Sequence, residues 1–274
     1  MPRNLREFQR IRLREDRLGM NDSSGIAIEF AKVRYGFDGG RVLLSDFNLA
    51  VRRGETLILL GRSGSGKTTL LKLVNRLLEP NAGDVLIGGK PSHQWDVIEL
   101  RRHLGYAIQD VGLFPHYTVK QNVGLLPKLE NWDRHRTDQR VEEVLRLVGL
   151  APEEFASRYP RQLSGGQKQR VGLARALAAD PPILLMDEPF GALDPITRAE
   201  LQREFEVLRR QLGKTVVFVT HDVSEALLLG DRIALMEPGR LHGVYTPREF
   251  VDSGDEQVRS YMEAFRAGRH ILQS

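Results

Sequence analysis

Residues 57–69 read LILLGRSGSGKTT, and this stretch decides the fold. A short apolar run, Leu57 to Leu60, leads at once into a glycine-rich turn that ends in Lys67 and Thr68. In a segment of the form GxxxxGK[ST], the glycines let the backbone bend so that N–H groups and a helix N-terminus face a polyphosphate. The lysine adds positive charge for the β and γ phosphates, and the threonine hydroxyl can ligate Mg²⁺. The stretch therefore predicts a strand, a phosphate-binding loop and a helix, in that order.

Alternating strands and helices extend on both sides of this loop. A helix is predicted over 70–78, because its leucines and valine recur at helical spacing. Strands are predicted at residues 26–30, 42–51, 183–186, 216–219 and 233–236. Helical patterns dominate between about 90 and 178, which indicates a helical insertion. Continuous apolar runs joined by crossover helices are typical of a parallel sheet covered on both faces, so the predicted fold class is α/β.

The composition is that of an ordinary globular protein. Of the 274 residues, 41% are hydrophobic and 28% are charged, which excludes collagen-like, mucin-like and wholly disordered chains. The absence of cysteine excludes disulfide scaffolds, thiolate metal sites and cysteine nucleophiles. No stretch approaches the roughly 18–20 apolar residues that span a bilayer, and the start lacks the apolar segment of a signal peptide. A net charge of +4 is too small to decide whether the partner is nucleic acid or lipid.

Polar side chains directly follow two more of the apolar runs. Asp187 and Glu188 come after the run that ends at Met186, and His221 comes after the run that ends at Thr220. Ligands of open parallel sheets bind beyond the carboxyl ends of the strands. If these strands are parallel, the two carboxylates and the imidazole share one edge with the phosphate loop. Asp187 is then suited to hold the hydration shell of Mg²⁺, and Glu188 to take a proton from an attacking water.

A second glycine-rich segment, LSGGQ at 163–167, opens a predicted helix that continues as KQRVGLARALAA. Ser164 is a natural N-cap, and the two glycines after it expose N–H groups at the positive end of the helix dipole. This is either a second anion site or an ordinary capped helix. The residues alone leave open whether it faces the first phosphate loop.

Taken in order, six features resemble the ATPase subunit of ABC transporters. They are the phosphate loop, the isolated Gln109, LSGGQ at 163–167, ILLMDEP at 183–189, the Ala192-Leu193-Asp194 turn and His221. The resemblance covers about residues 26–248. It implies a P-loop NTPase (RecA-like) core with a mostly parallel sheet, an N-terminal antiparallel β portion and an inserted helical subdomain. It also implies a head-to-tail homodimer in which each ATP lies between the Walker A loop of one copy and the LSGGQ helix of the other.

The resemblance also implies roles for single residues. Glu188 is the general base, His221 contacts the γ-phosphate, and Gln109 senses metal and water and links to the membrane partner. Asp194 lies at the dimer interface, and it also fits the N-cap of a helix with Pro195 at its first position. The implied metal-binding residues are Thr68, Gln109 and Asp187. The implied nucleotide-binding residues are Tyr35, Gly61, Arg62, Ser63, Gly64, Ser65, Gly66, Lys67, Thr68, Thr69, Ser164, Gly165, Gly166, Gln167 and Asp194.

Tyr35 is the residue that the resemblance places against the adenine ring. An aromatic face suits this role because it can stack on any purine. The spacing from Tyr35 to the phosphate loop is stretched by Asp38, Gly39 and Gly40, so Phe37 is the alternative.

The predicted domains are a basic extension at 1–24, an ATPase domain at 25–248 and a short helical tail at 249–274. The helical subdomain is inserted at about 90–178. Met20 is an alternative start of the chain. The implied partners are a second copy, transmembrane permease subunits and, indirectly, a solute-binding protein, with no nucleic acid. The implied location is cytoplasmic, peripheral on the inner face of the cell membrane. The segment 109–123 either docks a permease helix or forms local core.

The transported solute is predicted from two stretches, GLFPHYTVKQNVGLLPKLENW and MDEPFGALDPITR. They are most similar to ATPases that import quaternary amines such as glycine betaine, choline or carnitine. Many such subunits continue into paired CBS modules, which these 274 residues do not contain, so gating through a fused domain is not expected. An importer of another solute, such as an amino acid, is the alternative. A soluble ABC ATPase acting on nucleic acid is a further alternative, but the repair members of that class insert long heptad arms and the translation members join two cassettes in one chain, and neither feature is found in these 274 residues. A nucleotide kinase or GTPase shares only the phosphate loop and leaves LSGGQ unexplained.

Overall fold

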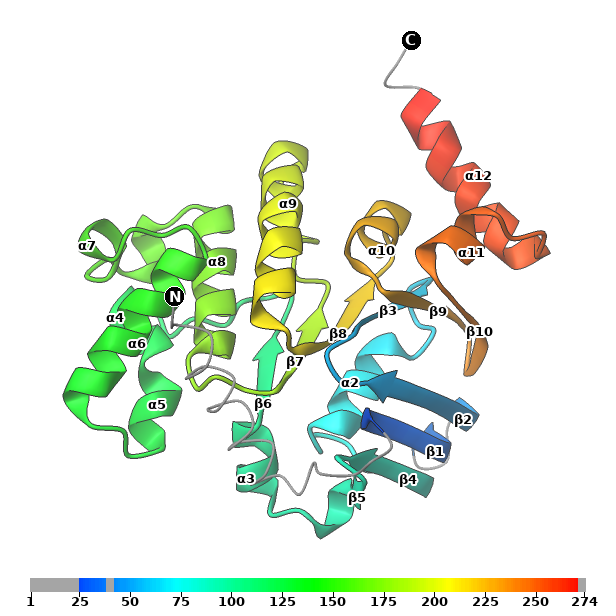
Figure 1. Ribbon diagram of the computed structural model, residues 1–274, viewed down its shortest axis with the longest axis horizontal. Helices are drawn as coiled ribbons and strands as arrows, with labels where there is room; N and C mark the ends of the chain where they lie inside the picture. Colours follow the sequence, from blue (N-terminus) through cyan, green and yellow to red (C-terminus); the bar gives the residue numbers. More distant parts are fainter. Residues whose placement is uncertain (1–24, 38–41, 271–274) are drawn as a thin grey trace. The chain divides into compact units, whose positions relative to one another are not determined.

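The computed structural model describes residues 25–37 and 42–270, which fall into two compact units (Figure 1). One unit is Asp96–Lys214, and the other takes the described residues on both sides of it in the sequence. The predicted extension at 1–24 lies outside the described residues, as do 38–41 and 271–274. The predicted helical insertion at about 90–178 stays a prediction, and most of it falls within Asp96–Lys214.

Two fully buried strands, β3 (Thr56–Gly61) and β8 (Thr215–Thr220), form the centre of the unit that carries the phosphate loop. β3 is parallel both to β8 and to β9 (Arg232–Glu237). β10 (Arg240–Tyr245) pairs with β9 in the antiparallel sense. Strands covered on both faces have no polar face, which is why their sequences are continuous apolar runs. Each of the three apolar runs predicted in this unit is confirmed as a strand.

The same unit contains a four-stranded antiparallel sheet in the order β2-β1-β4-β5. Its strands are β1 (Ile26–Gly36), β2 (Val42–Arg52), β4 (Ala82–Ile87) and β5 (Lys90–Pro91). β1 pairs with β2 on one side and with β4 on the other. This sheet is the antiparallel portion that the resemblance implies. The sequence did not predict β4, whose first three residues are exposed and carry no strand pattern.

Helix α2 (Lys67–Val74) follows the phosphate loop, but it ends four residues before the predicted end at 78. Asn75 caps it, and Arg76 then adopts a left-handed backbone conformation with a φ of 51°, which no helix can continue through. Leu77, predicted on the apolar face of this helix, is 52% exposed as a result. The apolar spacing in the sequence therefore extends beyond the last residue of α2.

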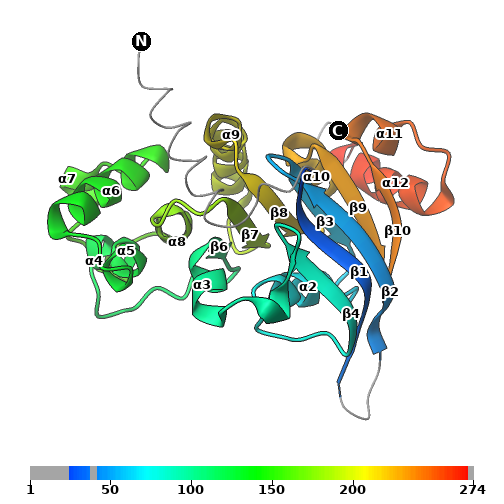
Figure 2. The same cartoon turned by 60° about the horizontal axis from the view of Figure 1, so that its bottom comes forward.

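The unit Asp96–Lys214 contains one parallel strand pair among helices. β7 (Ile183–Asp187) confirms the predicted run at 183–186, whereas its partner β6 (Leu104–Ala107) has only four residues and was not predicted. The helices are α3 (Val97–Arg102), α4 (Val119–Val123), α5 (Leu125–Leu129), α6 (Arg134–Leu147), α7 (Pro152–Phe155), η2 (Pro160–Gln162), α8 (Gly165–Leu177) and α9 (Pro195–Leu212). α4 and α6 pack on α8, and α5 and α7 lie against α6 (Figures 1 and 2).

The last helices of the chain gather beside β9 and β10 (Figure 2). The remaining elements of this unit are η1 (Ser92–Gln94), α10 (Val223–Leu229), α11 (Pro247–Val251) and α12 (Glu256–His270). Val258 and Met262 form the buried face of α12, with exposed fractions of 0% and 6%. The described part of the predicted helical tail thus contains an amphipathic helix. Across the part of the chain that the structure describes, we find no helix with the length and apolar character needed to cross a membrane.

Replacement of Gly105 in β6 by alanine is expected to destabilise the fold by about 1–3 kcal/mol, the usual cost of overpacking. An added Cβ would lie 2.5 Å from Leu184 Cδ2 and 2.6 Å from the backbone oxygen of Ala176, so strand or helix must shift. Thermal melting of Gly105→Ala measures the loss. Gly254→Ala is the matched control, because a Cβ there meets no heavy atom within 4 Å. Equal melting temperatures for the two variants would contradict the expectation.

Candidate functional site

The phosphate loop joins β3 to α2 and has the backbone of an anion cradle. Gly64 and Gly66 adopt left-handed conformations, with φ of 81° and 101°, that other residues rarely reach. A Cβ on Gly64 would have no heavy atom within 4 Å, so this glycine faces open space. The Ser65 hydroxyl oxygen is buried and has no hydrogen-bond partner in the structure. A polar atom left without a partner in such a loop fits a site that binds a polar ligand.

Lys67, the first residue of α2, is folded over this loop. Its ammonium group donates hydrogen bonds to the backbone oxygens of Gly61 at 2.8 Å and Arg62 at 2.9 Å. The side chain is only 4% exposed. The positive charge is therefore held at the loop, where the helix N-terminus adds its own positive potential.

His221 lies at the same edge of the sheet as the phosphate loop. β3 and β8 are parallel neighbours in which Leu60 pairs with Thr220, so the residues that follow both strands emerge together. The turn at His221 is fixed by hydrogen bonds: the N–H of Asp222 donates to the Thr220 hydroxyl at 2.9 Å, and that hydroxyl donates to the buried carboxylate of Glu225. The His221 side chain itself is exposed. In this unit the structure thus brings Lys67 and His221 to one edge, as the sequence predicts.

Asp187 and Glu188 lie at the carboxyl end of β7, in the other unit. Glu188 has a φ of 44°, a left-handed conformation that is strained for a residue with a side chain, and strain of this kind recurs at functional sites. Gln109 follows the neighbouring strand β6, whose last residue pairs with the one before Asp187. A Cβ on Gly191 would lie 3.4 Å from Gln109 Nε2 and 3.6 Å from Glu188 Oε2. The amide and the carboxylate therefore converge over this glycine.

The electrostatics at the end of β7 involve Tyr106 of β6. Burial, together with the negative charge of Asp187, raises the pKa of Tyr106 to about 12. The phenol therefore stays protonated at neutral pH and does not add a second negative charge beside the Asp187 carboxylate.

The LSGGQ segment forms a complete N-terminal cap for α8. The Ser164 hydroxyl accepts a hydrogen bond from the N–H of Gln167, and the Gln167 side chain accepts one from the N–H of Ser164. The N–H groups of Gly165 and Gly166 have no acceptor within the helix, because the first turn of a helix has none to offer. The predicted N-cap is thus confirmed, and it leaves two N–H groups without an acceptor inside the helix at its positive end.

Asp194 caps the neighbouring helix α9, with Pro195 at its first position. The pKa of the Asp194 carboxyl is lowered, and the largest cause is its hydrogen bond with the Thr197 side chain. Thr197 also packs on α8, since a Cβ on Gly166 would lie 2.5 Å from Thr197 Cγ2. The starts of α8 and α9 are therefore adjacent, and the structure brings Ser164 and Asp194 to one surface.

Helix α8 also holds the segment that contains Gln109, a link that the sequence analysis missed. Gln169 donates to the backbone oxygen of Gln109 at 3.2 Å, and Arg175 donates to that of Gly112 at 2.8 Å. Gly172 approaches so closely that a Cβ would lie 2.5 Å from Val111 Cγ1. These partners are 60 or more residues apart in the sequence, so no local pattern could have revealed them.

The aromatic residues before β2 differ in exposure. Tyr35 is 6% exposed and belongs to the core, whereas Phe37 is 63% exposed. The two rings meet edge to face with centroids 5.8 Å apart. The accessible ring face is therefore on Phe37, the alternative from the sequence analysis, and not on Tyr35.

Comparisons with known proteins identify the family. A model of the ABC transporter family matches residues 44–191, more than half of the chain. The chain is 47% identical to the glycine betaine/carnitine/choline transport ATP-binding protein OpuCA of Bacillus subtilis, over 87% of this chain and 62% of that protein. It is 51% identical to the glycine betaine uptake system ATP-binding protein YehX of Escherichia coli, over 78% of this chain and 69% of that protein.

A solved structure gives the same assignment. It is the dimeric post-hydrolysis state of the ATP-binding cassette MJ0796 bound to ADP and Pi, with a TM-score of 0.71 and 36% identity, over 81% of this chain and 99% of that one. The chain spans less than two thirds of OpuCA. The resemblance found in the motifs and the predicted fold class are both confirmed. On its family match, its sequence identity and its fold, the chain belongs to the ABC transporter family, among the ATP-binding cassettes.

Proposed function

We propose that this chain binds and hydrolyses ATP to power an ABC membrane transporter. The observation that carries the proposal is the phosphate loop, with its left-handed glycines, the buried ammonium of Lys67 and His221 at the same sheet edge. Such a loop holds a triphosphate through backbone N–H groups and one mobile positive charge. The names of OpuCA and YehX as transport ATP-binding proteins support the same function.

The residues at the ends of the strands take the chemical roles. Glu188 accepts the proton of the attacking water, Gln109 orients that water, and His221 contacts the γ-phosphate. Thr68 and Asp187 supply oxygen ligands of the kind that Mg²⁺ prefers, and the bound ion would neutralise charge on the phosphates. Among the described residues no three His, Cys, Asp or Glu side chains group to hold a metal.

The second anion cradle, at the start of α8, is proposed to face the ATP held by another copy. The N–H groups of Gly165 and Gly166 and the adjacent cap at Asp194 form one surface for this contact. Two copies arranged head to tail would then enclose two ATP molecules. The dimeric state of the cassette MJ0796 supports the pairing of two copies.

The segment 109–123 is proposed as the contact with a permease helix. Phe114 is 41% exposed, and its ring packs on Tyr117 with centroids 5.4 Å apart. Asn122, which is fully buried, hydrogen-bonds to the backbone of both residues and holds the segment at the surface. An exposed Phe114 ring that packs on the half-buried Tyr117 and is held by a buried asparagine favours docking over local core. This contact would place the chain on the inner face of the membrane.

Quaternary amines such as glycine betaine, choline or carnitine are proposed as the transported solutes, on the names of the relatives. A solute-binding protein would deliver them to the permease.

Two measurements test the function. The purified chain should hydrolyse ATP in the presence of Mg²⁺, and Lys67→Ala should not. Cells lacking the chain should lose uptake of labelled betaine, choline or carnitine but keep uptake of amino acids. Loss of amino-acid uptake alone would change the solute class.

Phe37 is proposed as the ring that stacks on adenine, in place of Tyr35. Phe37→Ala is expected to raise the Kd for ATP by about 10-fold, within the range measured for base–aromatic stacking. Tyr35→Ala removes a buried ring instead, so it should lower stability by about 3–5 kcal/mol and leave nucleotide affinity of the folded protein unchanged. Calorimetric titration and thermal melting separate the two effects. The reverse assignment of effects would return the role to Tyr35.

A further inference from the structure

A buried carboxylate with no part in the proposed chemistry lies next to the turn that carries His221. Glu225 belongs to the first turn of α10 and is 4% exposed, and Thr220, the last residue of β8, is 2% exposed. The Thr220 hydroxyl donates a hydrogen bond to Glu225 Oε2. A glutamate is almost never fully buried unless it is paired, so this hydrogen bond is part of what keeps Glu225 inside the protein.

The Thr220 hydroxyl also closes the turn at His221. Its oxygen accepts a hydrogen bond from the N–H of Asp222 at 2.9 Å, so this bond spans His221. A backbone N–H can only donate, so the hydroxyl is the acceptor there and its own proton goes to Glu225. The Asp222 carboxylate accepts from the N–H of Ser224 at 2.7 Å and caps α10. The backbone on both sides of His221 is therefore held by side chains.

Strand pairing fixes the other side of Thr220. Its partner in the parallel pair is Leu60 of β3, and Gly61, the first residue of the phosphate loop, follows Leu60 directly. The carboxyl end of β8 is therefore in register with the start of that loop. The contacts that fix the turn after Thr220 thus also fix the place of His221 relative to the phosphate loop.

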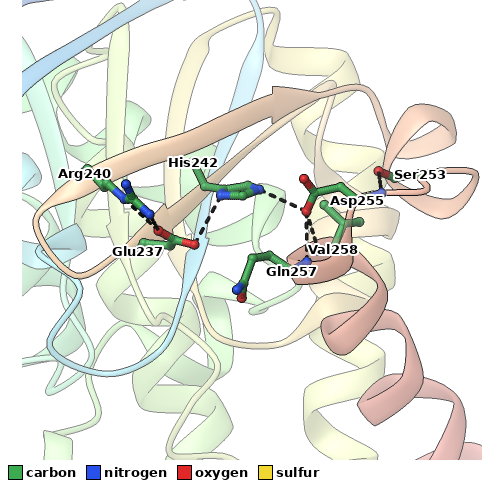
Figure 3. Close-up of polar contacts among 7 residues, drawn as sticks. All are labelled: Glu237, Arg240, His242, Ser253, Asp255, Gln257 and Val258. Atoms are coloured by element: carbon green, nitrogen blue, oxygen red, sulfur yellow. Dashed lines mark hydrogen bonds and ion pairs between the residues drawn. The ribbon is translucent and has the colours of Figure 1, made fainter.

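Helix α10 gives Glu225 a firm place, because it packs on β3, β8 and α12. At its C-terminal end, a Cβ on Gly230 would lie 2.7 Å from Ile58 Cγ1, so the helix and β3 are in direct contact. α12 is in turn tied to β10, since Nε2 of His242 lies 3.0 Å from Oδ1 of Asp255, the carboxylate that caps α12 (Figure 3). A hydrogen-bonding group on a packed helix holds a turn more accurately than one on another loop.

We propose that Thr220 and Glu225 are positioning residues for His221. Glu225 holds the Thr220 hydroxyl, and that hydroxyl holds the N–H of Asp222. The imidazole between them is thereby kept where it meets the γ-phosphate. The inference rests on the proposed function, because it requires that His221 contact the γ-phosphate of ATP. It assigns both residues a role in hydrolysis that they perform through His221 and not by touching the nucleotide.

The test is Thr220→Val in the full 274-residue chain, because valine has nearly the same shape but neither donates nor accepts. We expect kcat for MgATP hydrolysis to fall by about 10-fold, the effect of one lost hydrogen bond to a charged group. The Kd for MgADP should stay at the wild-type value, since ADP lacks the phosphate that His221 contacts. Thr220→Ser keeps the hydroxyl and should restore most of the rate. Weaker MgADP binding in Thr220→Val would indicate damage to the phosphate loop and would overturn the inference.

Thr215→Val is the matched control. Thr215 stands at the other end of β8, is 3% exposed, and accepts a hydrogen bond from the N–H of Gly54 at 3.0 Å. The substitution removes one buried hydroxyl from the same strand without touching the turn at His221. It should lower the melting temperature about as much as Thr220→Val does and leave kcat unchanged. An equal loss of kcat in the two variants would assign the effect to stability and overturn the inference.

A double-mutant cycle with His221→Ala separates the positioning of His221 from any other effect of Thr220. If Thr220 acts through the imidazole, Thr220→Val should not slow single-turnover hydrolysis further once the imidazole has been removed. Additive losses in the double variant would overturn the inference and leave the proposed function standing. Failure of the wild-type chain to hydrolyse MgATP would overturn both.

Glu225→Leu tests the carboxylate. Leucine fills the space without accepting a hydrogen bond, so kcat should fall as it does in Thr220→Val. Glu225→Gln keeps an acceptor oxygen and should retain most of the rate. A wild-type kcat in Glu225→Leu, or an equal loss in Glu225→Gln and Glu225→Leu, would remove Glu225 from the proposal.

Discussion

Glu188→Gln is expected to bind MgATP with wild-type affinity and to hydrolyse it at least about 100-fold more slowly, the usual contribution of a general base. An amide of the same shape cannot accept a proton at neutral pH, whereas the contacts of the phosphate loop are untouched. The strained backbone at Glu188 and its convergence with Gln109 over Gly191 place the carboxylate where a water can be held. Single-turnover hydrolysis and equilibrium binding, measured on the same preparation, separate the two steps.

Glu200→Gln is the matched control for this prediction. Glu200 is exposed on α9 in the same unit, so the substitution removes the same charge without touching the end of β7. It should hydrolyse ATP at the wild-type rate. Near-normal turnover in Glu188→Gln would place the base at another residue, and loss of binding would indicate a structural role for Glu188.

Ser164→Arg is expected to abolish ATP-dependent dimers while leaving ATP binding by the single chain intact. A long cationic side chain at the N-cap of α8 would fill the space in front of the N–H groups of Gly165 and Gly166. The phosphate loop lies elsewhere in the sequence and in the other unit, so its own affinity should not change. Light scattering in the presence of MgATP, with Glu188→Gln as the background to prevent hydrolysis, measures the mass of the complex.

Ser164→Ala is the control that separates steric blocking by the arginine side chain from loss of the N-cap hydroxyl. It removes the hydroxyl that accepts from the Gln167 N–H, which should cost about 1 kcal/mol of stability, but it adds no bulk. We therefore expect a lower melting temperature with dimers still formed. If Ser164→Arg also dimerises with ATP, the second cradle does not face a nucleotide and the head-to-tail arrangement is wrong.

The sequence predicted the buried strands because their environment leaves a direct trace in composition. β3 and β8 are covered on both faces, and a strand in that position must be apolar throughout. β6 was missed because four residues are too few for a pattern, and β4 because it begins with exposed residues. The end of α2 was misplaced because the left-handed backbone at Arg76 leaves no mark on the apolar spacing of Leu77.

The candidate site, too, has parts that the sequence predicts and parts that it does not. The phosphate loop, the cap at Ser164 and the cap at Asp194 were predictable, because each depends on neighbours within a few residues. The difference in exposure between Tyr35 and Phe37 was not predictable, since only packing decides that Tyr35 is covered and Phe37 is open. Contacts between distant segments were also beyond local patterns, and the hydrogen bond from the Gln169 side chain to the backbone oxygen of Gln109 is an example.

The close approach of Gly172 to Val111 has a mechanical consequence. Gly172 has no side chain to separate α8 from Val111, and Gln169 and Arg175 of α8 donate hydrogen bonds to the backbone of the segment that begins at Gln109. The helix and the surface segment are therefore in close contact along this stretch. A neighbour that pushes the segment inward by even an ångström must either break those bonds or carry α8 along. We therefore expect the segment and α8 to move together, so that a displacement of the segment reaches the glycines that follow Ser164.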